Sequence, residues 1–336
     1  MKRVVLFNVN WLGDVLFSTP AIRALKKTHP DAEITCVVSP RVAELLKTNP
    51  YLSRVITLED RLGPSKLGAM ASLVWTLRAG RFDTAVFFSR SRTRAFLAML
   101  AGIGRRVGYA KGARKYFLTD TLAEPAEPKH KTDLFLDLLA VLGVEPDGAA
   151  PDFVPETGAG ERVKNLLAQK HMEPGEPYAV VHTGGNWALK RWPAEHFSAW
   201  IKLLRRKSPL RLVFCGGDGE KLLVEEIIRR ADDARSVSIC GQTDVSMLAL
   251  ILKGAAFVLS NDSGPIHLAA SQSAPIIGLF GPTRAAMTGP RSNGRVSIIE
   301  SDFGCELPCY FSECRDRKCM AALAPETVMA RTAEFL

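Results

Sequence analysis

The sequence predicts an α/β protein with two Rossmann-like domains. Short β-branched runs alternate with amphipathic helical stretches, a pattern typical of βα units on a mainly parallel sheet. The alternation stops in a stretch rich in Pro and Gly at 145–160 and then restarts, and a length of 336 residues suits two domains of about 150 residues each. We therefore expect domains at 1–155 and 156–325, followed by a terminal segment at 326–336.

The first half opens with an apolar run that predicts a strand at 4–8 and closes with a predicted helix at 131–142. In that helix, apolar residues recur at the three-and-four spacing of one buried face. The other strands expected in this half lie at 34–38, 55–58, 84–88 and 106–108, with helices between them.

The second half repeats the same alternation of strands and helices. Pro193 and Glu195 indicate a helix start, because Pro suits the first turn and an acid suits the positive end of the helix. A glycine-rich turn at 216–220 lacks both the G-x-G-x-x-G spacing and a Walker A lysine, so it does not by itself indicate NAD or ATP chemistry. The strands expected here lie at 178–182, 210–215, 237–239, 257–259, 276–279 and 296–299.

Two of the predicted strands run into a helix through polar and glycine residues. The first passes through Gly13 and Asp14, and the second reads Asn261-Asp262-Ser263-Gly264 before Pro-Ile-His-Leu-Ala-Ala. Free backbone N–H groups at such a turn are where α/β proteins bind anions. Both turns are therefore candidate binding sites.

These two turns, with His182-Thr183-Gly184-Gly185-Asn186-Trp187, Lys190-Arg191-Trp192-Pro193 and Phe280-Gly281-Pro282-Thr283, resemble the ADP-heptose:lipopolysaccharide heptosyltransferases of glycosyltransferase family 9. The resemblance spans nearly the whole chain and is greatest to the heptosyltransferase II group. It implies a GT-B fold, in which two Rossmann-like domains face each other across a cleft. The first domain would bind the acceptor and the second the nucleotide sugar, and the helix at 326–336 would pack back toward the first.

The resemblance also implies an activity. The chain would be an inverting glycosyltransferase that moves heptose from ADP-heptose to the inner core of lipopolysaccharide, without a catalytic metal or other cofactor. Two alternatives stay open: a GT-B transferase for another nucleotide sugar or glycan acceptor, and a non-catalytic protein that binds anionic lipid or nucleic acid.

The resemblance carries roles over to individual residues. Asp14 would be the general base, although an Asp at a helix start often only caps the helix. Lys190 would contact the donor pyrophosphate and stabilise the charge that develops on the leaving group. A lone His is commonly a packed structural residue, but His267 follows the Asp-Ser-Gly motif at a spacing that favours binding. The other expected donor-binding residues are Thr183, Gly184, Asp262, Ser263 and Gly264.

The positive charge of the chain is concentrated in one region. Its formal net charge is +9, and residues 61–131 contain 14 Lys or Arg against four acids. This basic region has three possible interpretations: it binds nucleic acid, it binds an anionic lipid or phosphorylated sugar, or it has no partner. Because the sequence contains no nucleic-acid-binding motif, we favour the second. The expected acceptor-binding residues are Gly13, Arg61, Arg90, Arg92, Arg94, Lys111, Arg114 and Lys115.

Four of the seven cysteines cluster near the C-terminus with the spacing C-x3-C-x4-C-x4-C. This spacing is looser than the paired cysteines of most thiolate zinc sites, so structural zinc, free or oxidised thiols, and disulfides all stay open. The cluster consists of Cys305, Cys309, Cys314 and Cys319.

The expected location follows from the termini and the hydropathy. No apolar run approaches the roughly 18 residues that span a bilayer, and Met1-Lys2-Arg3 leads into a strand instead of a signal-peptide core. We expect a cytoplasmic monomer. With the resemblance, its partners would be ADP-heptose, the lipid A-core acceptor and the cytoplasmic surface of the inner membrane, and not nucleic acid.

Overall fold

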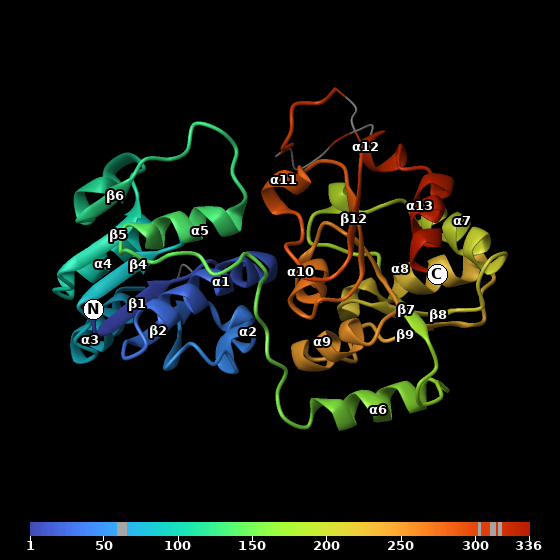
Figure 1. The fold of residues 1–336 in the computed structure, drawn as a ribbon, viewed down its shortest axis with the longest axis horizontal. Helices are drawn as coiled ribbons and strands as arrows, with labels where there is room; N and C mark the ends of the chain where they lie inside the picture. The colour runs from blue at the N-terminus through green and yellow to red at the C-terminus, as the bar shows by residue number, and fades with distance from the viewer. Residues whose placement is uncertain (59–65, 302–303, 310–313, 315–317) are drawn as a thin grey trace. The chain divides into compact units, whose positions relative to one another are not determined.

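The structure is a computed structural model that describes residues 1–58, 66–301, 304–309, 314 and 318–336. The chain divides into two compact units, Met1–Phe153 and Val154–Leu336. Each unit is built around a six-stranded sheet in which all neighbouring strands are parallel, with helices packed against the sheet (Figure 1). The predicted α/β class with two Rossmann-like units is confirmed.

The sheet of the first unit reverses its strand order beside its first strand. The chain adds strands on one side of β1 and then on the other, which puts a topological switch point between β1 and β4. The order across the sheet is β3 (Arg54–Thr57), β2 (Glu33–Val38), β1 (Arg3–Phe7), β4 (Thr84–Phe87), β5 (Arg105–Tyr109) and β6 (Asp120–Leu122).

Two sets of helices cover this first sheet. Helix α1 (Leu12–Thr28) packs against α5 (Lys131–Ala140), while α3 (Lys66–Ala79) and α4 (Arg92–Leu100) pack over a core that includes the stacked rings of Phe7 and Phe87. The shorter elements are η1 (Pro40–Val42), α2 (Glu44–Lys47) and η2 (Gly112–Phe117).

The second sheet has the same plan, with its switch point between β7 and β10. Its central strands are buried along their whole length, because they are covered on both faces. The order is β12 (Val296–Glu300), β11 (Ile276–Phe280), β10 (Val258–Asn261), β7 (Tyr178–His182), β8 (Arg211–Cys215) and β9 (Ser236–Ser238).

Helix α13 completes the core of the second unit. It packs on α7, and two buried indoles anchor this C-terminal segment: Trp200 Nε1 donates to Thr332 Oγ1 at 3.0 Å, and Trp192 Nε1 donates to the Leu323 carbonyl at 2.8 Å. Packing of the terminal helix toward the first unit stays a prediction. The helical elements are α6 (Ala159–Gln169), η3 (Ala188–Lys190), α7 (Ala194–Arg205), η4 (Asp218–Glu220), α8 (Lys221–Ala231), α9 (Val245–Lys253), α10 (Gly264–Ser271), α11 (Ala285–Thr288), α12 (Lys318–Ala321), α13 (Pro325–Thr332) and η5 (Ala333–Phe335).

The predicted strands are all present, with ends that differ from the expected ones by no more than two residues. Strand β6 was not predicted, because its three residues lie at the sheet edge and carry no apolar run. Pro193 occupies the N-cap of α7 instead of its first turn, and Glu195 lies in the first turn as expected.

Candidate active site

The polar residues of the second unit meet at the carboxyl ends of β7 and β10, which is the switch point of that sheet. Asp262 directly follows β10, and Lys190 ends the short helix η3 in the loop after β7. Lys190 Nζ donates to Asp262 Oδ2 at 2.5 Å, and the Asp262 side chain is only 4% exposed. Residues 72 positions apart are therefore paired where open α/β sheets bind ligands.

The Asp262 carboxylate has further polar neighbours. Thr283 Oγ1 donates to Asp262 Oδ2 at 2.6 Å and Thr288 Oγ1 does so at 3.4 Å, while His267 Nε2 lies 3.9 Å from Oδ1. A buried carboxylate needs hydrogen-bond donors to offset its lost hydration. An anionic ligand can therefore replace Asp262 as the partner of Lys190, because the Asp262 carboxylate keeps the hydroxyl donors of Thr283 and Thr288.

A second set of polar groups links Ser263 to Glu220. Ser263 Oγ lies 3.0 Å from His182 Nδ1, and His182 Nε2 lies 3.8 Å from Glu220 Oε2. Glu220 also accepts from the backbone N–H groups of Gly185 and Gly217, at 2.9 and 2.8 Å. Burial would raise the pKa of Glu220, but His182 and these backbone donors lower it to about 2.

The Glu220 carboxylate explains two of the glycines in the predicted turns. A Cβ on Gly184 would lie 1.2 Å from Glu220 Oε1, and one on Gly216 would lie 2.4 Å from Oε2. The glycine-rich turns after β7 and β8 therefore leave room for one carboxylate that bonds to both.

Asn261 joins the loops after β7 and β10. Its Nδ2 donates to the carbonyls of Thr183 and Gly184 at 2.9 and 3.1 Å, and its Oδ1 accepts from Trp192 N at 3.1 Å. Thr183 is itself buried, and its Oγ1 has no hydrogen-bond partner within the described part of the chain. That hydroxyl is free to bind a ligand at the switch point.

Helix α10 begins at this same point. Ser263 is its N-cap, but the side chain makes no capping hydrogen bond, and Gly264 is the first helical residue. The uncapped N–H groups of a first turn favour an anion. The structure thus brings together the donor-binding residues predicted from the sequence, namely Thr183, Gly184, Lys190, Asp262, Ser263, Gly264 and His267.

Asp14 lies in the first turn of α1, close to the switch point of the first sheet. It does not cap that helix, because the N-cap is Trp11 and no side-chain capping bond is present there. Instead, Lys131 Nζ at the start of α5 donates to Asp14 Oδ1 at 2.7 Å. Among the described residues, Oδ2 has no hydrogen-bond partner, so one carboxylate oxygen is held and the other is open.

The predicted basic surface is only partly exposed. Arg94 and Arg114 are buried, contrary to the expectation of a solvent-facing cluster: Arg94 Nη1 donates to the Asn8 carbonyl at 2.8 Å, and burial lowers the pKa of Arg114 to about 10. From α4 and η2, these two side chains reach the carboxyl ends of β1 and β4. Arg90, Arg92, Lys111 and Lys115 are exposed, and Arg61 lies outside the described residues.

Arg114 has unused hydrogen-bonding capacity. Its Nη2 makes one long bond of 3.4 Å to the Phe87 carbonyl, while Nε and Nη1 are buried and have no partner in the described ranges. Arg90 Nη2 nearby donates to Glu124 Oε2 at 2.6 Å. A buried guanidinium with two unmet nitrogens, at the end of the sheet, is suited to contact an anion.

Two of the four clustered cysteines lie against the turn after β11. Cys309 N donates to the Pro282 carbonyl at 2.8 Å, and a Cβ on Gly281 would lie 3.2 Å from Cys319 Sγ. All seven cysteines are free thiols in this structure, and within the described residues no three His, Cys, Asp or Glu side chains converge as a metal site. The disulfide alternative is not realised here, and zinc binding stays untested.

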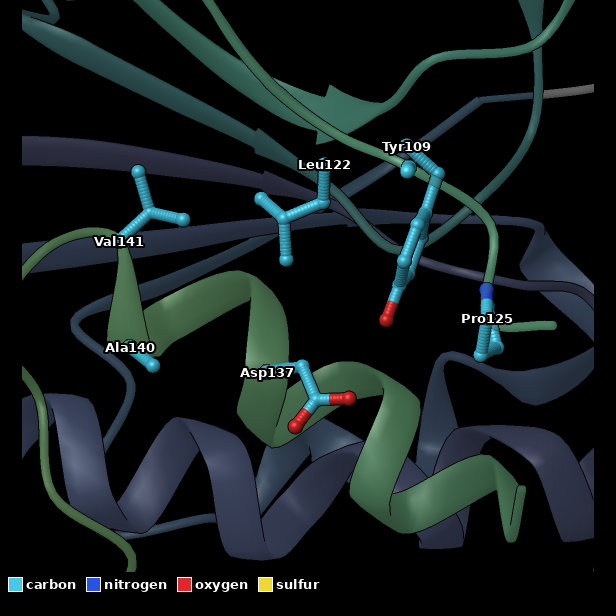
Figure 2. A pocket seen from close by; sticks show the side chains of 7 residues that line it. Tyr109, Leu122, Pro125, Asp137, Ala140 and Val141 are labelled. Carbon is cyan, nitrogen blue, oxygen red and sulfur yellow. The ribbon is translucent and has the colours of Figure 1, made fainter. Parts of the chain in front are cut away.

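The first unit also contains a shallow pocket of about 460 Å³ between β5, β6 and α5 (Figure 2). Tyr109 and Asp137 line it, but both are engaged: the Tyr109 hydroxyl donates to the Leu134 carbonyl, and Asp137 accepts from Lys129 Nζ. None of the predicted site residues lines this pocket, and we assign it no ligand.

Three residues of this site were quoted only as parts of motifs or turns: His182, Glu220 and Asn261. Their roles depend on contacts between loops, although a carboxylate just after a glycine-rich turn could have indicated Glu220. Lys131 was missed as well. Its signal was a lysine at the start of a helix, where the helix dipole disfavours a cation unless an anion lies opposite.

Comparison with known proteins gives consistent matches. Residues 70–320 match the profile of glycosyltransferase family 9 (heptosyltransferase). Lipopolysaccharide heptosyltransferase 3 of Escherichia coli K12 is 24% identical over 333 residues, which cover 96% of this chain and 95% of that protein.

Two solved structures share the fold. A family 9 glycosyl transferase from Veillonella parvula superposes with a TM-score of 0.87 at 20% identity, covering 99% of this chain and 97% of that one. The E. coli ADP-heptose lps heptosyltransferase II superposes with a TM-score of 0.81 at 21% identity, covering 100% of this chain and 98% of that one.

Across the described residues, no helix has the length and apolar character needed to cross a membrane.

Proposed function

Because this chain belongs to glycosyltransferase family 9, the heptosyltransferases, and is therefore a glycosyltransferase, we propose that it transfers heptose from ADP-heptose to the inner core of lipopolysaccharide with inversion. The observation that carries the donor assignment is the set of residues at the switch point of the second sheet. There the buried hydroxyl of Thr183, the amine of Lys190 and the uncapped start of α10 lie at the carboxyl ends of β7 and β10.

The second unit supplies the donor contacts in this proposal. Lys190 and the first turn of α10 bind the pyrophosphate, and the Thr183 hydroxyl forms a hydrogen bond to the nucleotide sugar. Glu220 follows the second strand of a Rossmann unit, where a carboxylate commonly binds ribose hydroxyls. As the bond from the sugar to the phosphate oxygen breaks, its electron pair leaves with ADP, and Lys190 stabilises the growing negative charge.

The first unit supplies the base. An acceptor hydroxyl attacks the anomeric carbon from the side opposite the leaving group and gives its proton to Asp14 Oδ2. Lys131 holds Oδ1 at 2.7 Å, which fixes the carboxylate and leaves the second oxygen toward the acceptor. Lys131 is thus a positioning residue, and Gly13 lets the acceptor approach the backbone.

Acceptor recognition uses the cationic residues after β4 and β5. The exposed side chains of Arg90, Arg92, Lys111 and Lys115 bind acceptor phosphates or carboxylates. The buried Arg94 and Arg114 add positive charge below them, and Arg61 has the same proposed role.

Replacing the four exposed cations with Gln should raise the KM for acceptor and leave the KM for donor unchanged. Added salt should mimic this, since exposed charges are screened within about 8 Å at physiological ionic strength.

We place the enzyme at the cytoplasmic face of the inner membrane as a peripheral monomer that needs no metal ion for catalysis. The lipid A-core acceptor is anchored in that membrane, so the enzyme has to work at its surface. Structural zinc on the four clustered cysteines stays a proposal of its own, with no role in the reaction.

The decisive experiment is a transfer assay on the full chain with a panel of nucleotide sugars and defined lipid A-core acceptors, read by mass. The proposal expects one added heptose with release of ADP. Transfer of a different sugar from the panel would replace the donor assignment and keep the transferase. No transfer and no nucleotide release with any donor would support the non-catalytic anionic-lipid or nucleic-acid-binding alternative.

A further inference from the structure

One outer layer of the first unit is formed by α3, α4 and η2. Leu77 of α3 and Ala98 of α4 are buried in the same core under this layer. Arg78 Nη2 donates to the Leu100 carbonyl at 2.8 Å, and the rings of Phe96 and Phe117 lie 5.2 Å apart, so the three elements touch in sequence. Figure 1 shows α3 and α4 beside each other in this unit. Their outward sides therefore form a single surface.

Large apolar side chains project from this surface into solvent. Trp75 of α3 is 72% exposed, Tyr116 of η2 is 73% exposed and Leu100 of α4 is 43% exposed. Among residues 68–74 of α3 the exposed ones are small, and in sequence the charged residues of this helix are Lys66 and Arg78, near its ends. A surface helix of a soluble protein normally has a polar outer face, so this one is suited to a partly apolar environment.

The charge of the layer has one sign. Its three elements contain six Lys or Arg and no Asp or Glu. Arg94 and Arg114 are buried, whereas Arg78, Arg92 and Lys115 are exposed beside the apolar side chains. Lys115 Nζ lies 5.2 Å from the centre of the Tyr116 ring. Aromatic side chains next to cations, without acids, match the headgroup level of an anionic bilayer.

We propose that the outer surface of α3, α4 and η2 seats the protein on an anionic lipid bilayer. Trp75, Leu100 and Tyr116 enter the headgroup region, and the exposed cations contact lipid phosphates. Exposed aromatic side chains beside cations, with no acid among the described residues of these three elements, match the apolar and anionic character of such a bilayer. This inference deepens the membrane part of the proposed function and rests on it for its biological setting, but not for its physical basis.

The test is cosedimentation of the full chain with phosphatidylcholine vesicles that contain or lack phosphatidylglycerol. Wild type should bind the anionic vesicles and be released by salt. Trp75→Ser should weaken partitioning about tenfold through lost apolar burial. Arg78→Gln and Lys115→Gln should each weaken it roughly fivefold on anionic vesicles alone.

Matched controls lie on the second unit. Leu222 is 79% exposed on α8 and Lys164 is exposed on α6, so Leu222→Ser and Lys164→Gln should bind vesicles like wild type. Because Trp75 is mostly exposed, Trp75→Ser should melt at the wild-type temperature, which separates lost binding from lost folding.

Three results would overturn the inference. The first is that Trp75→Ser binds vesicles as well as wild type does. The second is that binding does not depend on phosphatidylglycerol. The third is that wild type self-associates and Trp75→Ser does not, which would make this surface a protein interface. The binding assay contains no sugar substrate. A lack of vesicle binding would therefore contradict the membrane surface and leave the transferase assignment intact. A protein that binds vesicles but transfers no sugar would contradict the transferase assignment and leave the membrane surface intact.

Discussion

The Gly184→Ala substitution tests whether Glu220 organises the donor site. The new methyl group would lie 1.2 Å from Glu220 Oε1, so the carboxylate has to leave its place. It then loses its bonds to the backbone N–H groups of Gly185 and Gly217. Hydrogen bonds to charged groups contribute about 1.5–3 kcal/mol each, and a partly exposed carboxylate can recover some of this from water, so we expect a loss of about 2–4 kcal/mol in unfolding free energy.

The pH dependence tests the same interaction. Glu220 has its pKa lowered from 4.5 to about 2 in the folded chain, which corresponds to about 3 kcal/mol. Because the folded-state pKa is the lower one, this stabilisation is complete above pH 4.5 and is lost as the pH falls from about 4.5 to about 2. The stability difference between wild type and Gly184→Ala should therefore shrink over that range.

The assay is urea unfolding followed by circular dichroism, with ADP affinity measured in parallel. Gly219→Ala is the matched control, since its Cβ would meet no atom within 4 Å in the same turn as Glu220. In a Glu220→Ala background the new methyl group has room, so Gly184→Ala should then change the free energy of unfolding very little. The reasoning is refuted if Gly184→Ala is as stable as Gly219→Ala, or if its cost is unchanged in the Glu220→Ala background.

Four further predictions concern the reaction and the cysteines. Asp14→Asn should lower turnover by several orders of magnitude with ADP affinity kept, and more than about a tenth of wild-type activity, about 1.4 kcal/mol in barrier, would exclude it as the base. Lys131→Ala should lower kcat about tenfold without changing the donor KM, Lys131→Arg should restore part of it, and neither should matter in the Asp14→Asn background. Lys190→Ala should weaken ADP binding and slow turnover, with only partial rescue by Arg; unchanged kinetics would place it outside the site. Cys309→Ser should lower the melting temperature more than the activity per folded molecule, and metal analysis of protein purified without chelator should separate zinc from packed thiols, whereas a normally folded but inactive variant would contradict a structural role.

The sequence by itself determined the class of fold and the turns that we propose as ligand-binding sites. Apolar alternation depends on neighbouring residues only, so it located the strands to within two residues and separated the two halves. The turns after β1 and β10 could be recognised because polar residues and glycine follow directly on an apolar run. The pattern placed Asp14 and Asp262 in candidate binding turns, and the resemblance to the heptosyltransferases supplied their expected roles.

Tertiary structure decided which side chains meet. Lys131 reaches Asp14 across 117 positions and Asn261 reaches Thr183 across 78, distances over which no local pattern carries information. The burial of Arg94 and Arg114 was also invisible in the sequence, because a basic segment has the same composition whether it faces solvent or packs over the ends of the strands. Strand order sets these pairings: the switch points put β1 beside β4 and β7 beside β10, and only that arrangement gathers the loops that follow them.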